Sequence, residues 1–390
     1  MKNTDKKTFN LGIVAIAICA AAFIWFSARP GLIGTFHWHV GIFCAYIFLL
    51  VTALLPVIFL VINILKTNKA TKILSRVFSI FSMTLWIIIF VALSILPRLP
   101  IDKAGLNLFY QNDELPVSTS PAEKDLLAHY AFASDPHWGS GNSNAEARTQ
   151  ILKQIDSRDY DAFFCLGDMS EVGMVPPIVQ GAVNDLRDNL KNTKTLVIPG
   201  NHDFIVNGGP AFRNAFMQKG DKYYFRMDNG TIHMIFLFMV WDDVEFTKKQ
   251  EKWLIKQLEE IPQEDTVIVL SHCYVTGSGY YDSSAKKNWG DIPGVIESVC
   301  PILEKYDVDL HLSGHNHFFE FLEKDNIDYL ILGAMGGALD KDLIYSSPYS
   351  KWLDNEDFGW LDMKVYKNNL ELTIYKYDGT VLKTKSIATY

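Results

Sequence analysis

Long apolar runs occupy the first hundred positions of the chain, and a different pattern follows them. Three runs, at about residues 10–28, 41–65 and 76–96, are almost free of charged side chains. A helix of about 20 apolar residues crosses the hydrocarbon core of a bilayer, and each run reaches that length. We therefore expect residues 1–97 to form a transmembrane segment of three helices.

From about residue 127, apolar residues alternate between short β-type runs and stretches with helical spacing. The stretches NSNAEARTQILKQI and FTKKQEKWLIKQLEEI begin with capping residues and repeat apolar positions every three to four residues. Between such stretches lie apolar runs of strand length, among them DAFFCLGD, TLVIPGNHD and TVIVLSH. We expect an α/β domain over residues 127–390, joined to the apolar segment by a Pro-, Ser- and Asn-rich linker at residues 98–126.

Charge divides the chain in the same way. The first 100 residues carry nine Lys or Arg and one acid, whereas the remainder carries 27 basic and 43 acidic residues. The basic residues gather before the first apolar run and between the second and third, and the positive-inside rule places those ends in the cytoplasm. Three crossings then put residues 127–390 on the exoplasmic side of a multi-pass protein embedded in a lipid bilayer. A domain this acidic suits no nucleic-acid backbone, so we expect no nucleic-acid partner.

Polar side chains follow five of the β-type runs, at the point where each run ends. The five segments are SDPHWG, LGDMSE, PGNHDF, LSHCYV and SGHNHFF. Ligands collect at the carboxyl ends of strands in open α/β sheets, so these ends are expected to converge. Oxygen and imidazole donors without cysteine suit Zn, Mn or Fe. The collected residues are Asp135, His137, Asp168, Asn201, His202, His272, His315 and His317.

In their order, these five segments resemble the motifs of the calcineurin-like metallophosphoesterases: Asp-x-His, Gly-Asp, Gly-Asn-His-Asp/Glu, a lone His, and Gly-His-x-His. Every position is filled, and the resemblance covers about residues 128–385. It implies a four-layer α/β/β/α sandwich and two divalent metal ions (Mn, Zn or Fe), with Asp168 bridging the ions. By the same resemblance, the first ion is bound by Asp135, His137 and His317, and the second by Asn201, His272 and His315.

The resemblance also implies a reaction, the hydrolysis of a phosphate ester by in-line attack of a metal-bridging hydroxide. His202 would stabilise charge on the transferring group or protonate the leaving oxygen, and Asp203 would orient His202 or serve as a structural loop residue. Glu171 stands three residues after Asp168, where purple acid phosphatases place a tyrosine. This difference disfavours a purple Fe(III) centre.

The sequence leaves the substrate open. The transmembrane segment favours a lipid-linked or envelope phosphate ester, and a soluble nucleotide or monoester is the alternative. A catalytically silent membrane sensor or binding protein is the alternative of another class. Trp138, Tyr274 and the loop at residues 275–290 are candidates for an aromatic, gating rim or for ordinary buried aromatics. Metal identity, the choice of mono- or diester and the oligomeric state are likewise open.

Overall fold

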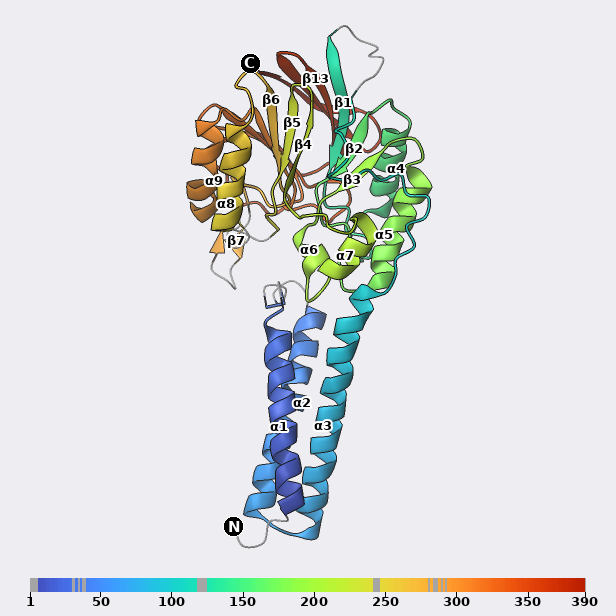
Figure 1. Ribbon diagram of the computed structural model, residues 1–390, viewed down its shortest axis with the longest axis vertical. Helices are drawn as coiled ribbons and strands as arrows, with labels where there is room; N and C mark the ends of the chain where they lie inside the picture. The colour runs from blue at the N-terminus through green and yellow to red at the C-terminus, as the bar shows by residue number, and fades with distance from the viewer. Residues whose placement is uncertain are drawn as a thin grey trace. The chain divides into compact units, whose positions relative to one another are not determined.

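The structure is a computed structural model of the chain. It forms two compact units, which are described separately below (Figure 1). The first unit comprises Met1–Leu99 and Ile205–Asn207, and the second comprises Pro100–Phe204 and Gly208–Tyr390. The residues that the structure describes are 6–29, 32–33, 36, 40–117, 125–240, 246–279, 281–282, 287–288, 290–291 and 293–389.

The first unit consists of three long helices and a short 3₁₀ turn: α1 (Lys6–Ser27), α2 (Val40–Leu65), α3 (Lys69–Ile95) and η2 (Leu96–Arg98). All three helices are long and apolar enough to cross a membrane, by length and composition only. Aromatic rings join the helices, since Phe59 stacks on Phe78 at 4.0 Å and Phe23 meets Trp86 at 5.8 Å. Many large apolar side chains remain exposed on the outside of the unit, which suits lipid.

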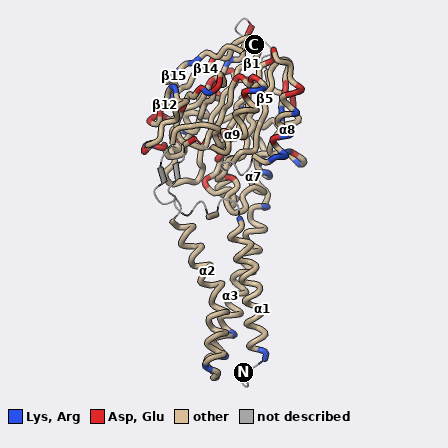
Figure 2. Tube along the Cα trace, turned by 90° about the vertical axis from the view of Figure 1, so that its left-hand side faces the viewer, with Lys and Arg blue, Asp and Glu red and all other residues tan. Residues whose placement is uncertain are grey.

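Basic residues gather at the end of this unit where α1 begins and α2 is followed by α3 (Figure 2). Arg76 on α3 donates from Nε to Thr8 Oγ1 on α1 at 2.7 Å, so the starts of the two helices are adjacent. Helix α3 begins at Lys69, ahead of the start near residue 76 that the apolar run predicts. The reason is a capping box, in which Asn68 accepts from the Thr71 amide and Thr71 accepts from the Asn68 amide.

The second unit contains two large sheets. The first sheet has the strand order β15-β14-β13-β1-β2-β3, and β1, β2 and β3 run parallel to one another. Strand β2 is apolar on both faces, and β1 is apolar except for the half-buried His129, as expected for strands covered on both sides. The strands are β1 (Leu126–Ala133), β2 (Ala162–Cys165), β3 (Thr195–Val197), β13 (Gly359–Tyr366), β14 (Asn369–Lys376) and β15 (Val381–Ala388).

The second sheet has the order β12-β10-β11-β9-β6-β5-β4, and β5, β6, β9 and β11 are parallel. Its strands are β4 (Phe225–Asn229), β5 (Ile232–Phe236), β6 (Thr266–Leu270), β9 (Leu310–Ser313), β10 (Phe319–Lys324), β11 (Ile327–Leu332) and β12 (Ser350–Asp354). A separate two-stranded ladder pairs β7 (Tyr281–Asp282) with β8 (Lys287–Asn288).

Helices cover the outer face of each sheet (Figure 1). One apolar cluster fills the space between the sheets and includes Phe132 and Phe236. A second cluster joins the first sheet to α4, α5 and α7, and a third joins the second sheet to α8 and α9. The predicted four-layer α/β/β/α sandwich is thereby confirmed. The helices are α4 (Ala145–Asp156), α5 (Pro176–Asn189), α6 (Asn201–Phe204), α7 (Gly209–Phe216), α8 (Lys248–Glu259) and α9 (Pro293–Lys305).

Residues 100–117, expected to be part of a linker, pack against the sandwich. Leu108 forms a parallel bridge with Thr195 of β3, and the side chains of Phe109 and Leu115 are buried between the sheets. Burial of these two large side chains outweighs the loop-like composition around them. Residues 118–124 lie outside the described residues, and the domain boundaries at residues 97 and 126 stay predictions.

Candidate metal centre

The predicted ligands follow the carboxyl ends of five strands, β1, β2 and β3 of the first sheet and β6 and β9 of the second, which are parallel within their sheets. Asp135 and His137 follow β1, Asp168 follows β2, Asn201 follows β3, His272 follows β6, and His315 and His317 follow β9. The structure brings them together with His202. Their donor atoms fall into three overlapping groups in which all atoms lie within 4.8 Å of one another: Asp135, His137 and His317; His137, Asp168 and His202; and Asp168, His272 and His315.

Asn201 completes the third group. Its amide oxygen Oδ1 lies 2.9 Å from His272 Nε2 and 2.9 Å from His315 Nδ1. Asp168 Oδ2 lies 3.4 Å from His272 Nε2 and 3.5 Å from His137 Nε2, so one carboxylate oxygen faces two of the groups. The geometry thus separates an Asp135–His137–His317 group from an Asn201–His272–His315 group, with Asp168 between them.

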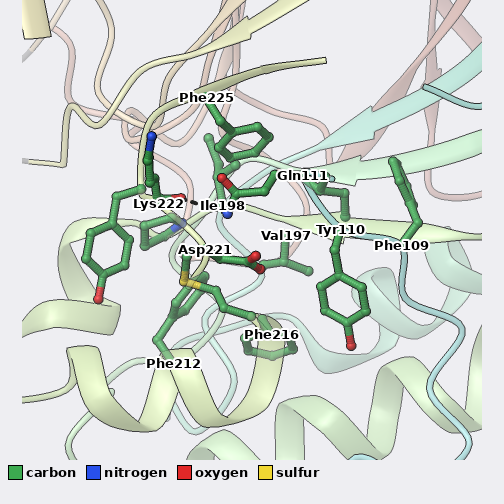
Figure 3. Close-up of a pocket in the computed structure, with 14 residues that line it drawn as sticks. Phe109, Tyr110, Gln111, Val197, Ile198, Phe212, Phe216, Asp221, Lys222 and Phe225 are labelled. Carbon is green, nitrogen blue, oxygen red and sulfur yellow. Dashed lines mark hydrogen bonds between the residues drawn. The ribbon is translucent and has the colours of Figure 1, made fainter. Parts of the chain in front are cut away.

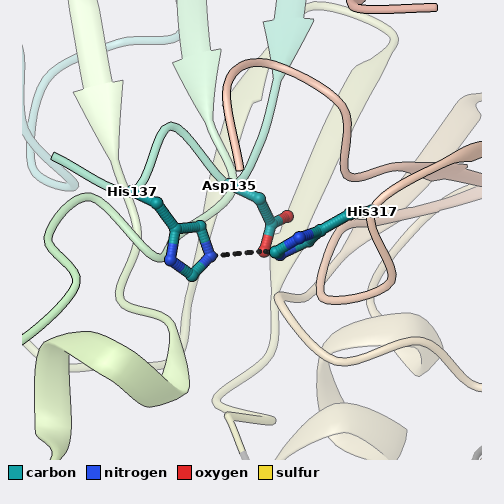
Figure 4. A group of neighbouring side chains, drawn as sticks. All are labelled: Asp135, His137 and His317. Carbon is teal, nitrogen blue, oxygen red and sulfur yellow. Dashed lines mark ion pairs between the residues drawn. The ribbon is translucent and has the colours of Figure 1, made fainter. Parts of the chain in front are cut away.

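The Asp135 carboxylate faces two imidazoles across short gaps (Figure 4). Its Oδ1 lies 3.7 Å from His137 Nε2 and 3.4 Å from His317 Nε2. Asp135 Oδ1 and His137 Nε2 are both buried, and among the described residues neither has a hydrogen-bond partner. Buried polar atoms without partners are costly unless something compensates them, and a cation coordinated between these atoms would do so.

Hydrogen bonds on the far side of three imidazoles aim the Nε2 atoms at the centre. His137 Nδ1 lies 2.8 Å from Glu171 Oε2, His272 Nδ1 lies 2.8 Å from the Leu166 carbonyl, and His317 Nδ1 lies 2.7 Å from the Ala338 carbonyl. Because these partners accept hydrogen bonds, each Nδ1 carries a proton, and Nε2 is the atom that a cation would bind. This is the arrangement that metal-binding histidines have in proteins.

Four predicted ligands have strained backbone conformations. The φ angles of Asp135, His137, Asp168 and His315 are 61°, 47°, 51° and 71°, in the left-handed region that side chains other than glycine rarely adopt. Such a conformation costs on the order of 1–3 kcal/mol at each residue, and it concentrates where function needs it. The strain therefore marks these strand exits as the functional part of the sandwich.

Glycines allow the strand exits to approach each other. Gly167 has a φ of +106°, and a Cβ atom there would lie 2.7 Å from His272 Nδ1. At Gly200 a Cβ atom would overlap the carboxylate of Asp168. The glycines of LGD and PGNHD are thus required by the close packing of the ligand loops.

Opposite charges stabilise one another inside this buried cluster. Burial would raise the pKa of Asp168, but the charges of His272 and His202 and a hydrogen bond to His137 hold this pKa well below its ordinary value. Burial would lower the pKa of His272, but the Asp168 charge raises it to about 9. The cluster is therefore polarised to hold its carboxylates ionised, as cation ligands must be.

Known proteins resemble this chain in sequence. Residues 128–319 match the family model of the calcineurin-like phosphoesterases. Residues 128–319 therefore form a calcineurin-like phosphoesterase domain. Among curated proteins it is 25% identical over 188 residues to probable purple acid phosphatase 20 of Arabidopsis thaliana, covering 45% of this chain and 43% of that protein. It is 30% identical over 99 residues to human tartrate-resistant acid phosphatase type 5, covering 25% of this chain and 27% of that protein. The chain thus spans less than half the length of these two relatives.

Solved structures share the fold. Purple acid phosphatase PPD1 from yellow lupin seeds superposes with a TM-score of 0.59 at 17% identity, covering 70% of this chain and 55% of that chain. GAP50, the anchor in the inner membrane complex of Plasmodium, gives a TM-score of 0.51 at 16% identity, covering 67% of this chain and 90% of that chain. At these identities the likeness concerns the fold alone.

In this calcineurin-like phosphoesterase, His202 lies at the edge of the cluster. Its amide donates to Asp168 Oδ1 at 2.8 Å, and its Nδ1 lies 2.9 Å from the Glu171 carbonyl. The His202 and His137 rings meet edge to face, with centroids 4.6 Å apart. Burial lowers the pKa of His202, against the opposing effect of the Asp168 charge.

Asp203 has a different setting from the one that an orienting role for His202 requires. Its carboxylate accepts hydrogen bonds from the Met169, Ser170 and Gly200 amides and from Ser170 Oγ, at 3.0 to 3.2 Å. Burial, together with the Asp168 charge, raises the pKa of Asp203 to about 6. This geometry favours the structural role that the sequence left open, because Asp203 ties the Asp168 loop to the Gly200 loop.

The sequence pattern does not predict the role of Glu171 in this cluster. Its carboxylate holds His137 and its main-chain carbonyl holds His202, so it touches one predicted ligand and the predicted catalytic histidine. The only signal in the sequence is its place three residues after Asp168, where a purple acid phosphatase carries tyrosine. That position does not reveal which neighbour the side chain contacts.

The two aromatic residues that could have formed a rim are buried. Trp138 is 5% exposed and donates from Nε1 to Asp185, and Tyr274 is 1% exposed and donates to the Gly290 carbonyl. Both therefore belong to the apolar clusters rather than to an open rim. Residues 280, 283–286 and 289 of the expected gating loop lie outside the described residues.

A pocket separate from this cluster lies beside the edge strand β3 (Figure 3). Its walls include Phe212 and Phe216 of α7 and Val197 of β3. Asp221 also lines it, and the Asp221 Oδ2 atom accepts from the Gln218 amide at 2.7 Å. None of the predicted ligands is among the described residues that line this pocket.

Proposed function

We propose that this protein is a membrane-anchored, metal-dependent phosphoesterase. The observation that carries the proposal is the buried cluster of carboxylate, amide and imidazole donors, in which Asp135 Oδ1 and His137 Nε2 face a common space. Such donors fit Mn²⁺, Zn²⁺ or Fe²⁺. Bound there, two divalent ions would lower the pKa of water and neutralise charge on the phosphate. The proposed ligands are Asp135, His137 and His317 for one ion, Asn201, His272 and His315 for the other, and Asp168 for both.

Asp168 is suited to be the shared ligand. One of its oxygens faces His137 and His272, which belong to different groups. The other accepts the His202 amide hydrogen bond at 2.8 Å, which fixes the plane of the carboxylate. Asp203 supports this position because its carboxylate accepts from the Met169 amide, next to Asp168, and from the Gly200 amide of the neighbouring loop.

His202 is suited to move a proton. The Glu171 carbonyl can only accept a hydrogen bond, so His202 Nδ1 carries the hydrogen and Nε2 is the atom proposed to contact the substrate. Protonated at Nε2, the imidazole donates to the leaving oxygen of the ester as the phosphorus–oxygen bond breaks. The main chain of Glu171 holds the ring in place, which is one of the two roles that the sequence left open for Asp203.

The three apolar helices support a membrane location, and the basic end of the first unit supports placing residues 100–390 on the exoplasmic side. A phosphate ester carried by a lipid or by an envelope polymer is therefore the substrate that we favour. The acid phosphatases among the relatives favour a soluble monoester as the second candidate.

Hydrolysis by the full chain in lipid nanodiscs tests the proposal. The substrates are p-nitrophenyl phosphate, its bis-ester and a phosphatidic acid presented in the same bilayer, each with Mn²⁺ or Zn²⁺. We expect turnover by the wild type and none by Asp168→Ala. Faster turnover of the lipid than of the soluble esters supports the membrane substrate. Metal binding without hydrolysis of any ester would instead identify a silent sensor. If a reporter fused after Tyr390 is active, and that reporter works only in the cytoplasm, the proposed orientation is refuted.

A further inference from the structure

A buried arginine contacts the turn between two of the proposed ligands. Arg148 lies on α4, is 6% exposed, and donates from Nη1 to the Pro136 carbonyl at 2.9 Å. Pro136 separates Asp135 from His137, and its carbonyl belongs to the peptide group that joins Pro136 to His137. Both neighbours of Pro136 have left-handed backbone conformations, which need support from outside the turn.

Arg148 itself donates from Nη1 to Ser143 Oγ at 3.4 Å and is held by two further side chains. Its Nε lies 3.5 Å from Asp185 Oδ2 on α5, and its guanidinium carbon stands 4.7 Å from the ring centre of Trp138. The Trp138 indole donates to the same Asp185 oxygen at 2.6 Å. Arg148, Asp185 and Trp138 therefore form a closed set, named here the turn clamp, in which each side chain contacts the other two. A rigid planar guanidinium suits this use better than a flexible ammonium.

The clamp reaches His137 by a second route. The Trp138 carbonyl accepts from the Glu171 amide at 2.9 Å, and the Glu171 carboxylate lies 2.8 Å from His137 Nδ1. The first route ends at the peptide group between Pro136 and His137, and the second ends at the His137 side chain. Among the described residues, the side-chain contacts of the clamp do not include Asn201, His272 or His315.

We propose that the turn clamp is a positioning unit for one of the two metal positions, the one formed by Asp135, His137 and His317, and that the other position does not depend on it. The inference rests on the proposed two-metal function. Loosening the turn releases the strained conformations of Asp135 and His137, and the affinity of that position falls. The second position keeps its own supports, such as the 2.8 Å contact of His272 Nδ1 with the Leu166 carbonyl.

The test is a calorimetric titration of the metal-free full chain with Zn²⁺ in nanodiscs. The wild type is expected to bind two ions. In Arg148→Ala, one ion should bind about 10–100-fold more weakly, the range for residues that support metal ligands, while the other changes less than about twofold. Arg148→Lys keeps a donor for Pro136 and should recover part of the loss. Trp138→Phe, which keeps a ring but loses the bond to Asp185, should lie between.

Arg158→Ala is the matched control. Arg158 is also stacked on aromatic rings, at 4.9 Å from Trp360 and 4.0 Å from Tyr375, but it contacts no ligand turn among the described residues. It should bind both ions as the wild type does. Far-ultraviolet circular dichroism checks each fold, and if Arg148→Ala fails to fold, the Lys and Phe variants decide the outcome.

Double variants identify the affected metal position. In protein that carries His315→Ala, the affinity for the remaining ion should fall when Arg148 is also replaced, whereas in protein that carries His137→Ala it should not. Equal affinities in Arg148→Ala and the wild type, or an equal loss at both positions, would overturn the clamp and leave the proposed function intact. A wild type that binds no ion would overturn the proposed function and the clamp with it.

Discussion

The hydrogen bond between Glu171 and His137 can be removed without touching the peptide group that holds His202. In Glu171→Ala the carboxylate 2.8 Å from His137 Nδ1 is lost, while the main-chain carbonyl 2.9 Å from His202 Nδ1 stays. A hydrogen bond to a charged group contributes about 1.5–3 kcal/mol. We therefore expect one of the two ions to bind roughly 10–100-fold more weakly, which agrees with the effect of losing a partner of a metal-binding histidine.

Glu171→Gln sharpens this expectation. The amide keeps an acceptor oxygen but no charge, and a neutral hydrogen bond is about half as strong as a charged one. Its affinity should therefore fall between those of the wild type and Glu171→Ala. Calorimetric titration with Zn²⁺ measures both variants, and kcat at saturating metal shows whether His202 still works. Glu146→Ala, which removes an exposed acid at the start of α4, is the control. Wild-type affinity in Glu171→Ala would refute the assigned role of Glu171.

Three further changes test other parts of the account. His202→Ala should keep both ions, measured by metal analysis, and lose about 10²–10⁴-fold in kcat, since it removes the proton donor but no ligand; an unchanged kcat would exclude that role. Gly200→Ala places a methyl group against Asp168 and should lower the free energy of unfolding, measured by denaturant titration, by about 1–3 kcal/mol. Its control, Gly181→Ala, adds a methyl group in open space on α5 and should raise that free energy by about 0.5–1 kcal/mol. Equal effects of the two substitutions would contradict the close approach of the loops. Burial raises the pKa of Asp309 to about 6, above its value in the unfolded chain, so this group favours folding below about pH 4 and loses that contribution as pH rises through 6. Asp309→Asn should therefore stabilise the protein by up to about 3 kcal/mol at pH 7.5 relative to pH 4. A stability difference between the two proteins that does not change with pH would contradict this.

The sandwich could be predicted from the sequence because its strands carry their own signals. Apolar runs of strand length end in polar residues and glycine, and parallel strands bring those ends to one edge of the fold. Asp135, Asp168 and His272 therefore meet as expected, although they are far apart in the chain.

Other features depend on contacts that no local pattern encodes. Glu171 and Asp203 are both acids near the predicted site, and only the folded loops show that Glu171 faces His137 while Asp203 binds backbone amides. Trp138 follows a ligand directly, yet its indole turns towards Asp185 on α5. The apolar run predicts a late start for α3 because basic residues interrupt it, whereas the cap at Asn68 decides where the helix begins.

The central claim is that the clustered donors form a two-metal phosphoesterase site. Its most direct test is p-nitrophenyl phosphate hydrolysis by the full chain after treatment with a chelator, during stepwise return of Mn²⁺ or Zn²⁺. The account predicts no turnover by the metal-free protein and full recovery at two equivalents, with no recovery in Asp168→Ala. Turnover that survives removal of the metal, or recovery in Asp168→Ala, would contradict it.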